Sequence, residues 1–284
     1  MKPSTATAQK NKKWLATKPA TLAALCLCVA STLPCLAARH PQSEISPQSL
    51  HPAITFESPM VPAWEGYATD GKNHYIFGVK KISEYNQHWQ QTQLNSTALA
   101  GLPSGVNHIG GGAYYHGKLY APVEHYAGCQ DVAVQTIAIY KAHKKGLPLI
   151  AQKSVASNGQ EISAVTIDGK KNELYTSSYC SGAKLMVYNL NTLQLERTIP
   201  LSKDLSMIQG ISWNPKYKEF ALAYDGPDSK VGYLSLVSAS GKVSKPIFTT
   251  APLGELEGID WTKQTKGEIR YAIAGHIYYL DLKN

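Results

Sequence analysis

Short stretches in which apolar and polar residues alternate recur along the chain, and turns rich in glycine, asparagine, proline or lysine separate them. Alternation with a period of two is typical of β-strands with one buried face, and helical periodicity is almost absent beyond the N-terminal segment. Five segments begin with the same pattern, which places an apolar residue second and a small residue fourth. They read AWEGYATDG (63–71), HIGGGAYYHG (108–117), EISAVTIDG (161–169), MIQGISWNP (207–215) and ELEGIDWTK (255–263).

Three more strands are predicted after each of these starts. The second strands read HYIFG, KLYAP, ELYTS, EFALA and IRYAI, and the third read KISEYN, TIAIYKA, KLMVYNL, KVGYLSL and HIYYLDL. Fourth strands fit HWQQTQL, PLIAQKSV, LQLERTI and KVSKPIFTT, whereas the fifth repeat lacks one before Asn284. We expect HPAITFES (51–58) to supply it, because pairing of the two ends closes a ring and removes an open edge.

The small residues of the five starts are spaced by 45, 53, 46 and 48 residues, and they are Gly66, Gly111, Ala164, Gly210 and Gly258. Four strands per unit at periods of this size are typical of a β-propeller. The repeats over 51–284 therefore resemble the β-propeller superfamily. The expected fold is all-β, a five-bladed propeller of four-stranded antiparallel blades closed by an N-terminal strand joining the last blade. A β-sandwich would also give short strands, but not five aligned small residues. The glycine run of HIGGGAYYHG holds an extra residue, which predicts a β-bulge.

The first 37 residues have the organisation of a secretory signal. They carry five lysines and no acidic residue, an apolar run from Thr21 to Val29 and a small-residue exit. A membrane anchor would need a longer unbroken apolar stretch. We therefore expect a signal peptide over 1–37, a polar leader over 38–50 and a propeller domain over 51–284. The mature protein is expected in the periplasm or outside the cell, as a monomer without membrane insertion.

Removal of the signal changes both the charge and the cysteine count. It takes five of the 28 basic residues and leaves 23 against 20 acidic ones, so no basic face for nucleic acid remains. It also takes three of the five cysteines. Cys129 and Cys180 fall in comparable loops of neighbouring blades, and in an oxidising compartment they are expected to form a disulfide. Two separate free thiols are the alternative.

The first strand of each blade lines the channel of a propeller, and its first and third motif residues share one face. These residues are Ala63, His108, Glu161, Met207 and Glu255 in the first position and Glu65, Gly110, Ser163, Gln209 and Glu257 in the third. Carboxylates near one axis repel one another unless a cation or proton intervenes, and oxygen-rich sites favour Ca²⁺. Glu65, Glu161 and Glu257 are thus candidate ligands of a channel calcium ion. A water-filled polar mouth is the alternative, and His108 beside Glu161 would also suit a transition metal.

Loops that follow the second strands open at the same end of the channel, which makes this face the candidate binding site. The candidate binding residues are His108, Glu124, His125, Tyr179, Gln209 and Asp225. The first functional hypothesis is an exported propeller that binds a small molecule, a glycan or a protein partner there. For any single charged loop residue, simple solvation is the alternative.

An enzyme is the second hypothesis. The starts AWEGYAT, MIQGISW and ELEGIDW resemble the strand starts of plant-type glutaminyl cyclases, which are exported five-bladed propellers. That resemblance implies a proton-transfer role for Glu65 or Glu257 and a pocket shaped by Trp64, Trp213 or Trp261. Glycosidases, lactonases and nucleotidases are further possibilities by analogy of fold. The glycine run precedes no helix and no serine lies in a strand-to-helix elbow, which argues against a phosphate cradle and a Ser-His-Asp triad.

Overall fold

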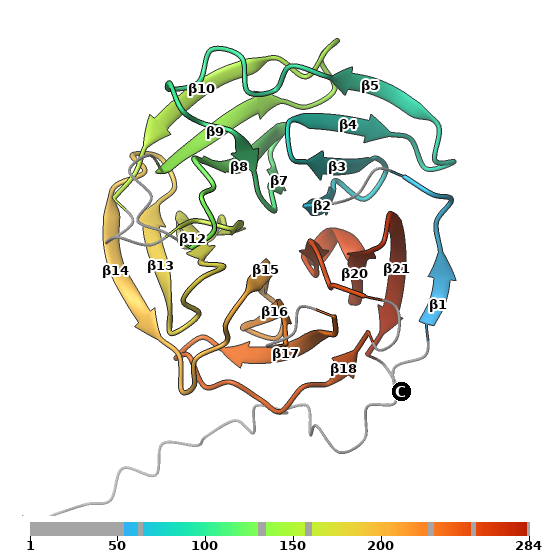
Figure 1. Cartoon of the computed structure of the whole chain (residues 1–284). Helices are drawn as coiled ribbons and strands as arrows, with labels where there is room; N and C mark the ends of the chain where they lie inside the picture. Colours follow the sequence, from blue (N-terminus) through green and yellow to red (C-terminus); the bar gives the residue numbers. More distant parts are fainter. Residues whose placement is uncertain are drawn as a thin grey trace, which may run out of the picture. The chain divides into compact units, whose positions relative to one another are not determined.

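Five antiparallel sheets follow one another around a common axis, four of them with four strands and one with five, because its first strand is split in two (Figure 1). The computed structural model of the 284-residue chain describes residues 54–61, 65–129, 135–156, 161–226, 230–250 and 254–282. The predicted signal peptide, the leader, Ala63 and Trp64 lie outside these ranges. The one helical element within them is the 3₁₀ turn η1 (Lys263–Thr265), and no described helix has the length and apolar character to span a membrane. The prediction of an all-β, five-bladed propeller is confirmed.

The first three blades follow the predicted repeats in chain order. Blade 1 contains β2 (Gly66–Thr69), β3 (His74–Gly78), β4 (Lys81–Tyr85) and β5 (Gln91–Asn95). Blade 2 contains β6 (His108–Ile109), β7 (Ala113–Tyr115), β8 (Lys118–Glu124), β9 (Gln135–Lys141) and β10 (Leu149–Ser154). Blade 3 contains β11 (Ala164–Asp168), β12 (Glu173–Ser177), β13 (Lys184–Asn189) and β14 (Leu195–Pro200).

The last two blades complete the ring. Blade 4 contains β15 (Ile208–Asn214), β16 (Glu219–Asp225), β17 (Gly232–Ser238) and β18 (Phe248–Thr249). Blade 5 contains β19 (Ile259–Asp260), β20 (Glu268–Ile273) and β21 (His276–Asp281), and β1 (Ile54–Glu57) pairs antiparallel with β21 as its outermost strand. The inner strands β3 and β12 are buried at every position, whereas the outer strand β10 is exposed at five of six. This gradient is expected when neighbouring sheets cover both faces of the inner strands.

The first strand of blade 2 is split by its glycine run. Ile109 pairs with Val123 and Ala113 with Tyr120, so four steps along the first strand match three along β8. One extra residue therefore lies in the run Gly110–Gly112, and the predicted β-bulge is confirmed. A side chain at Gly110 would not fit, because its Cβ would lie 2.0 Å from the carbonyl oxygen of Ser163 in blade 3.

The aligned small residues mark the places where blades approach the axis most closely. A Cβ on Gly258 would lie 2.2 Å from the Cα of Gly66, and a Cβ on Gly66 would lie 2.8 Å from the Cα of Gly111. Gly111 also forms an isolated parallel bridge with Ala164, in which its N–H donates to Ser163 O at 2.8 Å. Backbones at such distances leave room for hydrogen or, in blade 3, for a methyl group.

Hydrophobic clusters of the described residues lie at all five junctions between neighbouring blades. Representative buried pairs from blade 1 onward are Phe77 with Leu119, Tyr120 with Met186, Tyr175 with Phe220, Leu234 with Tyr271, and Ile277 with Ile76. The last cluster joins blade 5 directly to blade 1. Side-chain packing therefore closes the ring in addition to the pairing of β1, and it holds the inner strands in fixed positions around the axis.

Candidate acidic binding site at the channel mouth

A cavity of about 300 Å³ opens where the first strands of the blades begin, and we call it the mouth cavity. Its lining consists of Glu65, His108, Gly110, Tyr126, Glu161, Ser163, Tyr179, Gln209, Glu255 and Glu257. Eight of these ten residues come from the two motif columns of the sequence. The alternation of side chains along short strands, repeated around the ring, thus brings four carboxylates and one imidazole to one small space.

His108 connects two blades at the edge of this cavity. It stands opposite Glu124 in the β6–β8 pair, and its Nδ1 lies 3.1 Å from Glu124 Oε1. Its Nε2 lies 3.0 Å from Glu65 Oε2 of blade 1. Burial alone would lower the pKa of His108, but the hydrogen bonds to Glu124 and Glu65 outweigh it and raise the pKa to about 10. The imidazole is therefore a cation at neutral pH, shared by two carboxylates.

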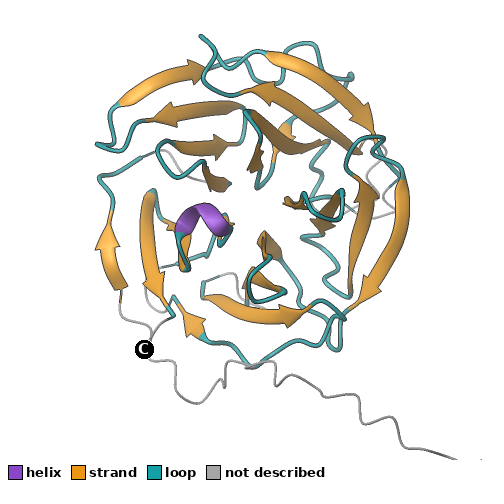
Figure 2. Cartoon of the chain, turned by 180° about the vertical axis from the view of Figure 1, so that it is seen from behind, coloured by secondary structure: helices purple, strands orange, loops and turns teal. Residues whose placement is uncertain are grey.

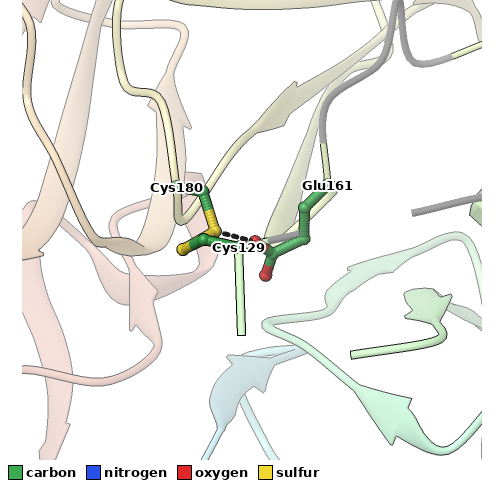
Figure 3. A group of neighbouring side chains, drawn as sticks. All are labelled: Cys129, Glu161 and Cys180. Atoms are coloured by element: carbon green, nitrogen blue, oxygen red, sulfur yellow. Dashed lines mark hydrogen bonds between the residues drawn. A yellow bond between two sulfur atoms is a disulfide. The ribbon is translucent and has the colours of Figure 1, made fainter. Parts of the chain in front are cut away.

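Glu161 lies beside the disulfide that the sequence predicted. Cys129 and Cys180 are bonded, with their Cα atoms 5.3 Å apart, and Cys180 Sγ lies 2.9 Å from Glu161 Oε2 (Figure 3). Burial and the nearby Glu124 carboxylate raise the pKa of Glu161 to about 9. A neutral carboxyl can donate to the disulfide sulfur, whereas a bonded sulfur has no hydrogen to offer.

A second group of acids lies across the cavity in blades 4 and 5. Glu257 is 7% exposed, and burial with the nearby Glu65 and Glu255 carboxylates raises its pKa well above the usual range. Its Oε2 is buried and has no hydrogen-bond partner among the described residues. Asp225 accepts a hydrogen bond from Gln209 Nε2 at 3.1 Å, and burial with the Glu255 carboxylate raises its pKa to about 7. The carboxyl groups at the mouth cavity therefore cannot all be ionised together unless a cation binds among them.

Two tyrosines cover the same cavity from the loops that the disulfide joins. Tyr126 and Tyr179 contact each other edge to face, with ring centroids 6.4 Å apart, and Tyr126 lies 5.3 Å from the His108 ring. The Tyr126 backbone is fixed by Asn107, whose Oδ1 accepts from Tyr126 N at 2.8 Å and whose Nδ2 donates to Tyr126 O at 3.2 Å. The rings thus form an aromatic side to an otherwise acidic cavity.

The predicted site residues fall into three groups. Glu65, His108, Glu161, Tyr179, Gln209 and Glu257 line the mouth cavity. Glu124 and Asp225 are buried behind it and hold His108 and Gln209. His125 is not part of it, because its ring points to another loop and Nδ1 lies 2.6 Å from the Gly105 carbonyl oxygen. Consecutive side chains of an extended segment point in opposite directions, which explains why Glu124 and His125 differ.

Sequence reasoning missed Tyr126 and misplaced two tryptophans. Tyr126 lies three residues before Cys129, so the expected disulfide was the signal that could have placed it near the mouth. Trp261 is fully buried between blades 4 and 5, and Trp213 lies at the opposite ends of the first strands. Neither shapes the mouth cavity, which corrects the expectation taken from the cyclase resemblance, and Trp64 lies outside the described residues.

The donor atoms at the mouth do not form a compact set of metal ligands among the described residues. Within the described residues, the group of three His, Cys, Asp or Glu ligand atoms that lie within 4.8 Å of one another is Cys129, Glu161 and Cys180. Both of its sulfurs belong to the disulfide and are not thiolate ligands. Glu65, Glu161 and Glu257 line one cavity without forming such a compact group. Calcium at these residues stays a prediction.

Comparison with known proteins assigns the chain to no family. No family model and no curated protein matches the chain. Among solved structures, it is similar to the hydrazine synthase of Kuenenia stuttgartiensis at 15% identity, with a TM-score of 0.46, over 80% of this chain and 58% of that one. A chain of a mitotic checkpoint complex matches at 8% identity, with a TM-score of 0.46, over 82% of this chain and 96% of that one. Raptor of Chaetomium thermophilum matches at 10% identity, with a TM-score of 0.41, over 77% of this chain and 19% of that one. The likenesses bear on neither ligand nor activity, and the cyclase resemblance stays a prediction.

Proposed function

We propose that this protein is an exported binding protein whose mouth cavity holds a small, positively charged ligand. The five-bladed propeller is a fold that supports ligand binding in general, and its channel ends are common places for it. The disulfide is consistent with an oxidising compartment outside the cytoplasm. The ligand class follows from the charges and surfaces of the cavity.

The buried, unpartnered oxygen of Glu257 is the observation that carries the proposal. A carboxylate oxygen without a donor is costly in a buried position, and Glu65, Glu161 and Glu255 surround the same space. His108 supplies one positive charge, but Glu65 and Glu124 already share it. A bound cation would let further carboxyls ionise, so its binding free energy includes relief of their mutual repulsion.

Tyr126 and Tyr179 favour an organic ammonium ion within this class. An ammonium group over a tyrosine ring gains about 0.5–2 kcal/mol from the ring's negative face. The cavity of about 300 Å³ has room for a ligand larger than a bare ion. Its carboxylates do not form one compact set of metal ligands among the described residues. Calcium, the cation proposed from the sequence, is therefore the second member of the class to be tested. A glycan or protein partner at this face has no comparable support in the lining.

Thermal unfolding of the mature protein provides the test. We expect choline, putrescine or Ca²⁺ to raise the melting temperature in a saturable way, because a ligand that binds only the folded state stabilises it. The uncharged carbon analogue of choline, dimethylbutanol, should have no effect. Glu257→Gln should remove the shift, and Glu196→Gln, which changes an exposed carboxylate on the outer strand β14, should leave it intact. No shift with any of the cations would overturn the proposal.

The raised pKa values also support an acid–base enzyme as the alternative. Asp225, with a pKa of about 7, has a value suited to proton transfer, and burial and the Glu255 carboxylate are its causes. We propose a hydrolase or cyclotransferase as this second candidate. Turnover of N-terminal glutaminyl peptides, lactones or aryl glycosides by the parent protein, abolished in Asp225→Asn with unchanged melting temperature, would favour the enzyme. Absence of turnover on all three substrate classes would remove its support.

A further inference from the structure

A second cavity lies at the opposite ends of the first strands, and we call it the far cavity. It has a volume of about 420 Å³, and each of the five blades contributes to its lining. The strand β11 shows the relationship, because Ser163 just before it lines the mouth cavity and Asp168 at its end lines the far cavity. Figure 2, which views the ring from the other side, shows η1 beside the centre of the ring.

The two cavities have no lining residue in common. A further space of only about 10 Å³ lies among residues of the first strands, both apolar ones such as Val165 and Ile211 and polar ones such as Asp260. This is at the lower limit for a single water molecule. The far cavity is therefore treated as a site of its own, with a lining distinct from that of the mouth cavity.

An aromatic surface in a fixed position forms one side of the far cavity. The rings of Tyr115 and His116 lie 4.1 Å apart at 31°. Tyr115 also lies directly against Gly169 in the next blade, where an added Cβ would be 2.2 Å from its hydroxyl oxygen. Contacts with the His116 ring and with the Gly169 backbone thus fix Tyr115, which is half-buried and lines the cavity. An aromatic ring fixed in this way can offer apolar surface to a ligand, and binding then costs little side-chain entropy.

Hydrogen-bond donors and acceptors line the far cavity together with the Tyr115 ring. Among the described residues, the Asp168 carboxylate accepts one hydrogen bond, from Lys170 N at 3.1 Å, which uses one of about four acceptor positions. Lys170 and Gln264 line the same space and offer an ammonium and an amide. Asp70 also lines it, but the amides of Lys72 and Asn73 already occupy its Oδ1. Asp168, Lys170 and Gln264 therefore have capacity for a ligand.

Trp213 adds an independent indication that an acceptor is missing from this region. Its indole Nε1 is buried and has no hydrogen-bond partner among the described residues, although indole N–H groups are usually paired when buried. Trp213 lines the far cavity from blade 4. A ligand hydroxyl seated beside it, directly or through a water molecule, would supply the acceptor.

We infer that the far cavity is a binding site for a neutral saccharide. A sugar ring presents a C–H face that suits the Tyr115 ring, and hydroxyl groups at its rim that both donate and accept. Lys170 offsets Asp168, and the remaining carboxylate, Asp70, is already hydrogen-bonded by Lys72, Asn73 and Tyr75. This end is therefore less acidic than the mouth with its four carboxylates, and it suits a neutral ligand better than an ion. A nucleotide is less suited, since Lys170 is the one lysine or arginine in the described lining. The inference does not depend on what the mouth cavity binds.

Calorimetric titration with cellobiose, maltose and diacetylchitobiose tests the inference on the full mature chain. We expect at least one of these disaccharides to bind at millimolar concentration or below. Tyr115→Ala should weaken it at least about fivefold through loss of the stacking surface, and Gln264→Ala should weaken it about threefold or more through loss of a hydrogen bond. Glu196→Gln, which changes an exposed carboxylate of β14 that lines neither cavity, is the matched control and should leave saccharide affinity unchanged. Glu257→Gln tests whether the sugar enters the mouth cavity instead.

The possible results separate clearly. Binding lost in Tyr115→Ala and retained in Glu196→Gln supports the far cavity as the site, provided both variants keep the parent's melting temperature. If Tyr115→Ala does not fold, the half-buried surface residue Gln264 gives the same comparison alone. Absence of binding by all three disaccharides overturns the inference. Binding that depends on Glu257 and not on Tyr115 or Gln264 also overturns it, because it would place the sugar in the mouth cavity.

Discussion

His108 Nε2 lies 3.0 Å from Glu65 Oε2, and this contact joins blade 2 to blade 1 at the edge of the mouth cavity. The other ring nitrogen is held by Glu124, which is fully buried. One half-buried imidazolium thus stabilises two carboxylates that would otherwise repel each other. The same charges determine both the stability of the ring at this point and the character of the cavity.

Replacement of His108 by glutamine should destabilise the protein at and below neutral pH. The pKa of His108 is raised from its ordinary value to about 10, so the contribution of the imidazolium is fully present below about pH 6.5 and is lost as the pH rises through 10. We expect a loss of about 1–3 kcal/mol in the free energy of unfolding near neutral pH, because buried carboxylates lose their donor. Urea unfolding across this pH range measures it, and a difference that does not shrink towards pH 10 would contradict the assignment.

Glu257→Gln should make the stability of the ligand-free protein less dependent on pH. Burial and neighbouring carboxylates raise the pKa of Glu257, so the folded state holds a proton that the unfolded chain releases near its ordinary pKa. Stability therefore falls as the pH rises above about 4.5. The variant removes one such group, while Glu161 and Asp225 remain. Between mildly acidic and alkaline buffer, the free energy of unfolding should change less in Glu257→Gln than in the parent. The control Glu196→Gln should behave like the parent. If the free energy of unfolding varies with pH equally in Glu257→Gln and Glu196→Gln, this explanation is excluded.

Removal of the disulfide should weaken both the fold and the mouth site. The double variant Cys129→Ser/Cys180→Ser releases a cross-link between residues 51 positions apart, which is expected to cost about 2–4 kcal/mol. Tyr126 and Tyr179 lie in the two joined loops, so the affinity for a cation at the mouth should also fall. Melting curves with and without reductant provide the check. The reduced parent should match the double variant, and a double variant that melts like the oxidised parent would show that the cross-link contributes nothing.

Gly258→Ala should damage the ring where blade 5 meets blade 1. The added methyl group would lie 2.2 Å from the Cα of Gly66, where only backbone can move. A loss of about 3 kcal/mol or more, or failure to accumulate soluble protein, is the expected result. Ala164→Gly changes the equivalent position of blade 3 in the opposite direction and should cost only about 1 kcal/mol. Parent-like stability of Gly258→Ala would mean that the blades do not approach as closely as described.

The repeating architecture could be predicted from the sequence because it rests on local patterns. The alternation within each strand and the small residue in each start recur five times, so a single ambiguous segment changes little. The same alternation placed Glu65, His108, Glu161, Gln209 and Glu257 around one cavity. Even the bulge followed from one extra glycine in blade 2.

What the sequence could not provide depends on contacts between distant residues. Tyr126 reaches the cavity because Asn107 and the disulfide fix its loop, and His125 turns away because Gly105 offers its carbonyl. The raised pKa values of Glu161 and Asp225 arise from burial and neighbours that no local pattern reveals. Trp213 has an unremarkable place in its strand, and only the assembled ring puts it at the far end of the channel.

The most direct test of the central claim is a calorimetric titration of choline at neutral pH, in two buffers that differ in heat of ionisation. If the cation enters the mouth cavity, carboxyls held neutral by burial and mutual repulsion ionise, so binding should release protons and its apparent enthalpy should differ between the buffers. Binding and proton release should both be lost in Glu257→Gln and kept in Glu196→Gln. Absence of binding by choline, by putrescine and by Ca²⁺ alike, or equal binding without proton release in parent and Glu257→Gln, would contradict a cation site at the mouth.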